Sequence, residues 1–174
     1  MINLKRIFAC IIIIAFVFTG CGIRLVNVDG PAMHPTIQDG DIFIMVTSTE
    51  RLRHSDIIVI EIPIEGFGDK IIITRIIGLP GDEINIDFDS GLITRNGNLL
   101  LHEMIGGYLY ESGHRINTPT NHSGDMADGI FTVPENHLFV LSDNRNNSFL
   151  DSRSDLVGFV DIDNVMGIAT NIIF

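Results

Sequence analysis

Beyond residue 24 the chain consists of short runs rich in isoleucine and valine, separated by turns rich in glycine, asparagine and aspartate. No run keeps the 3.6-residue apolar period of an amphipathic helix, whereas β-branched residues and alternation are typical of strands. The pattern therefore predicts an all-β body. We expect its strands at about Arg24–Val28, Asp41–Thr47, Asp56–Ile62, Lys70–Ile77, Glu83–Phe88, Leu92–Arg95, Gly129–Val133, His137–Ser142 and Asn164–Thr170. Asn96-Gly97 indicates a two-residue hairpin between Leu92–Arg95 and Asn98–Leu101.

Length and charge narrow the classes of function. With 174 residues the chain suffices for one domain with a real core. Its formal net charge of −11 argues against nucleic acid or an anionic membrane surface as a partner, because like charges repel. Both cysteines, Cys10 and Cys21, lie in or beside the N-terminal apolar segment, so the body has no disulfide.

The N-terminus has the pattern of a membrane segment. Lys5 and Arg6 precede an apolar run of 17 residues from Ile7 to Ile23, the lower limit for a membrane-spanning helix and also close to a secretory signal. The two basic residues place the N-terminus in the cytoplasm and the body outside. We therefore divide the chain into an N-terminal segment, residues 1–23, and an extracytoplasmic β domain, residues 24–174.

Two versions of the membrane segment remain open. Phe18-Thr19-Gly20-Cys21 resembles a bacterial lipoprotein cleavage site, which would leave Cys21 lipidated, although phenylalanine departs from the usual aliphatic residue there. Otherwise the segment stays in the membrane as an anchor. A buried core helix is the remaining alternative, but nothing amphipathic appears in the run.

The stretch Gly30-Pro31-Ala32-Met33-His34-Pro35-Thr36-Ile37 is a tight loop that leads into a strand. Prolines and glycines this close together exclude a helix, since proline lacks a donor and glycine favours positive φ. Taken alone, this stretch is equally well interpreted as an ordinary surface turn.

Two later stretches change that interpretation. They are Thr74-Arg75-Ile76-Ile77-Gly78-Leu79-Pro80-Gly81-Asp82 and Ser142-Asp143-Asn144-Arg145-Asn146-Asn147-Ser148, the latter closing with Asp151-Ser152-Arg153. In this order behind an apolar segment, the three boxes resemble those of the type I signal peptidases. These are membrane-bound Ser/Lys proteases that remove signal peptides from exported proteins. The resemblance covers roughly residues 7–170 and implies a signal-peptidase-like β-barrel or sandwich, with a variable insertion at about residues 102–128.

The chain departs from the family at both catalytic positions. The family pattern G-P-S-M-x-P-T has its serine nucleophile where this chain has Ala32, and K-R-I-I-G-x-P-G-D has its general-base lysine where this chain has Thr74. The apolar neighbours that would keep a lysine neutral, Ile71–Ile73 and Ile76–Ile77, are still present. Losing one member of a catalytic unit costs about 10⁴- to 10⁶-fold in rate, and losing the second adds little. We expect essentially no turnover by the family mechanism.

A substitute nucleophile or base is hard to find. Ser148 and Ser152 lie in the third box, and His34 is two residues from Ala32, but a solvated loop histidine is the simpler interpretation. The other histidines, at 54, 102, 114, 122 and 137, show no metal-ligand spacing, so we expect no metal and no cofactor.

The resemblance also assigns expected roles to individual positions. The substrate cleft would be lined by Val28, Gly30, Met33, Ile71 and Ile73. The structural motif would comprise Pro35, Arg75, Gly81, Asp82, Asp143, Asn144, Arg145, Ser148, Asp151, Ser152 and Arg153. Asp143–Arg145 and Asp151–Arg153 would brace the active-site wall, and Ser148 corresponds to a serine beside the lysine.

The leading hypothesis is a membrane-attached pseudoprotease that binds an extended peptide or exported protein. Its ligands would be signal peptides or pilin-like segments, and inactive relatives assist assembly of surface structures such as pili. The alternative is an active serine endopeptidase whose serine and lysine were altered, since Ser to Ala is a common engineered change, or which uses another nucleophile. An unrelated lipoprotein β domain is a third possibility, which would require three ordered boxes to be coincidence.

Overall fold

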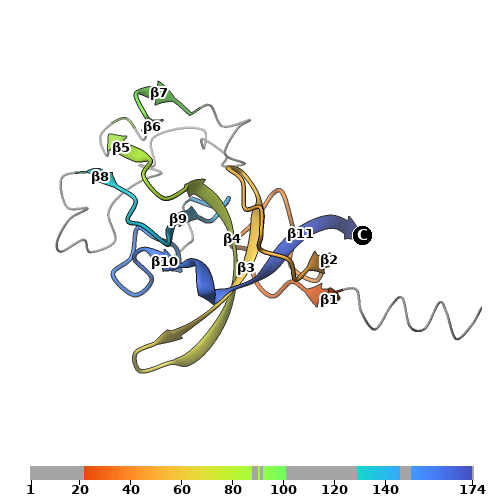
Figure 1. Cartoon of the computed structure of the whole chain (residues 1–174). Helices are drawn as coiled ribbons and strands as arrows, with labels where there is room; N and C mark the ends of the chain where they lie inside the picture. Colours follow the sequence, from red (N-terminus) through yellow and green to blue (C-terminus); the bar gives the residue numbers. More distant parts are fainter. Residues whose placement is uncertain (1–21, 88–89, 91, 101–128, 146–149, 174) are drawn as a thin grey trace, which may run out of the picture.

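A computed structural model describes residues 22–87, 90, 92–100, 129–145 and 150–173 (Figure 1). The strands are β1 (Ile23–Asn27), β2 (Ile42–Val46), β3 (Ile57–Ile64), β4 (Gly68–Gly78), β5 (Glu83–Asp87), β6 (Leu92–Arg95), β7 (Asn98–Leu99), β8 (Ile130–Thr132), β9 (His137–Leu141), β10 (Val160–Asp161) and β11 (Val165–Ile173). A single 3₁₀ turn, η1 (Ile162–Asn164), is the only helical element in these described ranges. The all-β prediction is confirmed.

The strands form two antiparallel sheets. The larger sheet has the order β1-β2-β11-β3-β4-β9-β10, and the smaller has the order β7-β6-β5-β8. Asn96 and Gly97 both have positive φ, at 51° and 75°, and join β6 to β7 as the predicted hairpin. Each predicted strand is found to within a few residues. The two-residue β10 and η1 were not predicted, because such short elements leave no periodic pattern.

The seven-stranded sheet bends along β11. The register of β11 shifts against β2 between Ala169 and Asn171, and against β3 between Val165 and Gly167. Such irregularities bend a strand and increase its twist. Gly167 is needed at this bend, since a Cβ there would lie 2.5 Å from the carbonyl oxygen of Val46. This bending is consistent with the approach of β1 to β4, which line one groove although three strands lie between them in the sheet order.

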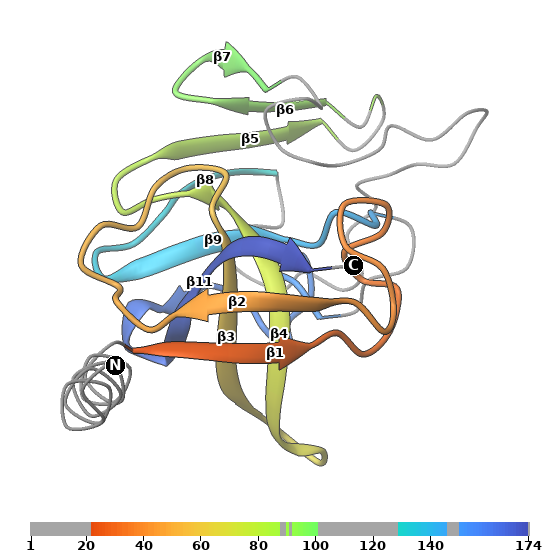
Figure 2. The same cartoon turned by 90° about the vertical axis from the view of Figure 1, so that its right-hand side faces the viewer.

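The two sheets share a core. The smaller sheet lies at one end of the molecule, and the β3–β4 hairpin projects from the other end (Figures 1 and 2). Ile77, Phe139 and Leu141 of the larger sheet pack in one cluster with Ile84 and Phe131 of the smaller sheet. The rings of Phe131 and Phe139 lie 4.8 Å apart, within the range of favourable aromatic pairs.

A second core cluster lies beneath the loop of the first box. Met33 and Ile37 from that loop are 1% and 0% exposed, and they pack with Val28, Phe43 and Val59. Their burial fixes the loop against the sheet through the hydrophobic effect. The loop is therefore part of the folded body.

The predicted N-terminal segment and the predicted insertion fall outside the description. Residues 1–21 and 101–128 are not among the described residues. Among the residues that are described, no helix is long and apolar enough to cross a membrane.

Candidate functional site: a peptide-sized groove beside Ala32

Hydrogen bonds to two aspartates just before β2 hold the loop that carries Ala32. The amide of Val28 donates to the carbonyl of Asp41 at 2.9 Å, and the amide of Gly30 donates to Oδ1 of Asp39 at 2.8 Å. Gly30 has a φ of +89°, which a residue with a side chain adopts only at a cost. The exposed Pro35 follows a cis peptide bond in this loop.

The third box fixes the loop from the other side. The backbone amide of Asn144 donates to the carbonyl of Ala32 at 2.9 Å, and its side-chain amide donates to the carbonyl of Pro31 at 3.1 Å. The two boxes are therefore in direct contact, although they are more than 100 residues apart in sequence. The side chain at position 32 is a methyl group without a hydroxyl, so no acyl-enzyme can form there.

Thr74 is buried within β4. It lies opposite Ile58 on β3, and Ile72 lies opposite Ile60, so by strand alternation Thr74 shares the face that packs into the core of the larger sheet. Thr74 is fully buried, and its Oγ1 atom has no hydrogen-bond partner in the part of the chain that the structure describes. A hydroxyl without a neighbouring base is a poor nucleophile.

A groove of about 350 Å³ lies between the end of β1 and the first half of β4. The five residues that the resemblance assigns to a substrate cleft all line this groove: Val28, Gly30, Met33, Ile71 and Ile73. Ala32 lines the groove as well, whereas Thr74 does not. Ile71 is 62% exposed, so the expectation that it would shield a buried amine is wrong.

Some lining residues were missed from the sequence. They are Val26, Asn27 and Leu150, whereas Asp29 and Ile72 lie between expected positions on the two walls. Extending the strand pattern backwards along the first wall would have included Val26 and Asn27. Leu150 had no signal, because it reaches the groove from the third box only through the tertiary fold.

Both walls of the groove have unpaired backbone edges within the described residues. β1 ends the larger sheet and pairs only with β2. β4 pairs with β3 from Gly68 to Arg75, but its pairing with β9 begins only at Arg75, which leaves Gly68–Thr74 unpaired on that side. Free strand edges bind extended peptides through main-chain hydrogen bonds.

The wall behind the groove is held by a buried ion pair. Nε and Nη2 of Arg75 donate to the two carboxylate oxygens of Asp143 at 2.8 and 2.6 Å. Its Nη1 atom donates to the carbonyl of Ser55 at 2.7 Å. Such a bidentate arginine–carboxylate contact fixes geometry as well as charge. Because Asp143 precedes Asn144, this pair also positions the contact with Ala32.

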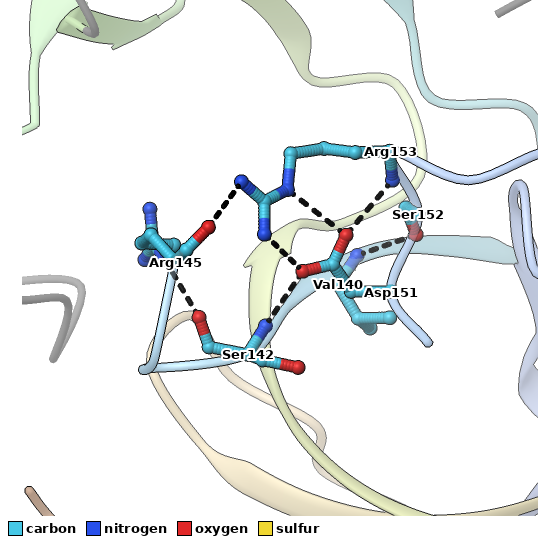
Figure 3. Close-up of polar contacts among 6 residues, drawn as sticks. All are labelled: Val140, Ser142, Arg145, Asp151, Ser152 and Arg153. Carbon is cyan, nitrogen blue, oxygen red and sulfur yellow. Dashed lines mark hydrogen bonds and ion pairs between the residues drawn. The ribbon is translucent and has the colours of Figure 1, made fainter. Parts of the chain in front are cut away.

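A second buried network lies in the third box (Figure 3). Nε and Nη2 of Arg153 donate to Asp151 at 3.0 and 2.7 Å, and the amide of Ser142 donates to the same carboxylate at 3.2 Å. Ser152 Oγ accepts from the amide of Val140 at 2.9 Å.

Nε of Arg145 donates to the carbonyl of Ser142 at 2.7 Å. Burial, together with the nearby Arg153, lowers the pKa of Arg145 to about 10. Several of these bonds join side chains to backbone atoms and so fix the path of the chain through the third box.

Asp82 closes the turn after the second box. Its Oδ2 atom accepts from the amide of Leu79 at 2.8 Å and lies 2.7 Å from Nε2 of His54, while Oδ1 accepts from Asn96 at 2.7 Å. Burial acts to raise the pKa of Asp82, but these three hydrogen bonds outweigh it and lower the pKa. Gly81 has the positive φ of 84° that this turn requires.

One predicted motif residue cannot be placed. Ser148 lies among residues 146–149, outside the described residues. His34 is exposed in the loop. Among the described residues, no group of three or more histidine, cysteine or acidic side chains is arranged to hold a metal ion.

Comparison with known proteins supports the resemblance to the signal peptidases. The model of the family described as signal peptidase, peptidase S26, matches residues 1–174. The chain belongs to the signal peptidase family.

Individual family members show the same relationship. The chain is 32% identical to signal peptidase I U of Bacillus subtilis, over 92% of this chain and 82% of that protein. It is 28% identical to signal peptidase I of Pseudomonas fluorescens, over 96% of this chain and 70% of that protein. A crystal structure of a signal peptidase I from Enterococcus faecalis is similar with a TM-score of 0.52 and 30% identity, covering 71% of this chain and all of that one.

Proposed function

We propose that this member of the signal peptidase family is a pseudoprotease that binds an extended segment of an exported protein without cutting it. The observation that carries the proposal is the groove between two strand edges that are unpaired within the described residues, lined by Ala32 where the family has its nucleophile. The position of the family's general base is Thr74, which is buried in the sheet core and does not line the groove. Val28, Gly30, Met33, Ile71 and Ile73 would contact the peptide. The apolar lining suits small or aliphatic side chains, and the strand edges suit an extended backbone.

Attachment to a membrane is part of this proposal. Ile23, Leu25 and Ile42 are 44%, 68% and 41% exposed on β1 and β2, directly after the apolar segment Ile7–Ile23. Exposed aliphatic side chains beside a membrane segment support a body held close to the bilayer on its outer side. Signal peptides and pilin-like segments are ligands that would be found there.

Peptide binding by matched variants tests the proposal. A fluorescent Ala-x-Ala peptide should bind saturably and be recovered intact. Ile71→Ser should weaken binding about threefold or more, because an apolar contact in the groove is lost. Ile130→Ser is the matched control, since Ile130 is 56% exposed on β8, in the other sheet.

Two outcomes would contradict the proposal. One is the absence of saturable binding in fluorescence anisotropy. The other is an equal effect of the two serine substitutions, which would place the peptide somewhere other than the groove.

A further inference from the structure

The charge on the groove is concentrated at a single lining residue. Asp29 is the only ionisable residue among the described residues that line the groove. It is exposed, and its carboxylate makes no hydrogen bond or ion pair within the described structure. The other lining residues are mostly aliphatic. A ligand in the groove therefore meets one uncommitted negative charge on an apolar surface.

Neighbouring carboxylates strengthen the negative potential at that end. Asp39 accepts from the amide of Gly30, and the backbone carbonyl of Asp41 accepts from Val28, so both residues lie against the wall that contains Asp29. The carboxylate of Asp41 also accepts from the amide of Gln38 at 2.8 Å. These two acids are engaged within the loop itself, which leaves Asp29 as the carboxylate available to a ligand.

Positive charges lie outside the lining. Arg24 lies on β1 before the first lining residue, Val26, and Lys70 lies on β4 directly before Ile71. Neither side chain lines the groove. With a net charge of −11, the protein attracts cationic ligands more than anionic ones.

We propose that Asp29 makes the groove selective for extended segments that carry a lysine or arginine among small or aliphatic residues. The inference rests on the proposed peptide-binding function and adds the chemistry of the ligand. Because Asp29 is exposed, its contribution is modest, about 3- to 10-fold in affinity for a lysine over a glutamine at the same position. The preference weakens at high salt, because mobile ions screen exposed charges.

A lysine scan tests the proposal on the full chain. Acetylated alanine-based heptapeptides, each with one lysine or one glutamine at a given position, would be titrated by isothermal calorimetry or fluorescence anisotropy. An extended peptide presents alternate side chains to one wall, so the lysine advantage should appear at one position or at alternate positions. Asp29→Asn should abolish that advantage, so that this variant binds lysine and glutamine peptides with similar affinity.

Asp163→Asn is the matched control. Asp163 is exposed on η1 and does not line the groove, and the substitution makes the same change in net charge. This variant should keep the lysine advantage.

The outcomes separate the two proposals. If glutamine peptides bind but lysine gives no advantage, or if Asp29→Asn leaves the advantage intact, the charge preference is overturned while peptide binding stands. If no peptide binds at any charge, the peptide-binding function is overturned and the preference with it.

Discussion

Ala32 and Thr74 have different surroundings, so the two departures from the family pattern have different consequences for the protein. Ala32 lines the groove and is tied through its carbonyl to Asn144, so its backbone is held although its side chain has no chemistry to perform. Thr74 is fully buried among isoleucines, with a hydroxyl that lacks a partner in the described structure. A buried polar atom without a hydrogen bond destabilises the folded state.

Thr74→Val is therefore expected to raise the free energy of unfolding by about 1 kcal/mol, because it removes an unsatisfied hydroxyl and keeps the shape. Urea unfolding followed by circular dichroism measures this change. Thr170→Val is the control, since the Thr170 hydroxyl is exposed and already donates to the carbonyl of Ile44 at 3.1 Å. A loss of stability in Thr74→Val would show that the hydroxyl has a partner.

Asp82 gives a pH-dependent contribution to stability. Its pKa is lowered in the folded protein from the ordinary value of 3.8. A carboxyl group with a lowered folded-state pKa stabilises the fold above its unfolded-state pKa, and this contribution is lost as the pH falls through the folded-state pKa.

Asp82→Asn should thus reduce stability at pH 7, and the difference from the unaltered protein should narrow as the pH falls below about 4. Thermal unfolding across pH 3 to 7 follows this difference. Asp163→Asn removes an exposed acid from η1 and controls for the change in net charge. A difference for Asp82→Asn that stays constant over the whole range would contradict the assignment.

At the scale of elements, β4 performs two tasks along its length. Its first half has a backbone edge that no described strand pairs with, and supplies Ile71 and Ile73 to the groove. Its second half pairs with β9 and supplies Arg75 to the buried contact with Asp143. The ion pair joins β4 to the third box and so holds the wall that contacts Ala32.

Arg75→Met should cost roughly 3–5 kcal/mol in the free energy of unfolding, because it leaves the fully buried carboxylate of Asp143 without its counter-charge. The double variant Arg75→Met/Asp143→Leu should recover much of that loss, since it removes both charges together. Urea unfolding of the two single variants and the double variant gives the coupling energy. Additive losses would show that the two side chains do not interact.

At the scale of the whole molecule, the sequence predicted the strands because nearly every strand has a buried face and therefore an alternating or β-branched pattern. It predicted both walls of the groove because those residues adjoin recognisable boxes. It missed Leu150, whose place in the groove depends on how the third box folds back. It also missed β10, since two residues carry no pattern, and it took Ile71 for a shielding residue because sequence does not distinguish a groove from a core.

The central proposal is that the groove binds peptide while the chain does not cleave it. The most direct test compares cleavage of an Ala-x-Ala preprotein by the purified chain with cleavage by the double variant Ala32→Ser/Thr74→Lys. The buried isoleucines around position 74 would keep a lysine there neutral enough to act as a base. We expect cleavage by the double variant and none by the chain itself. Cleavage by the unaltered chain at a comparable rate would contradict the account and would require another nucleophile.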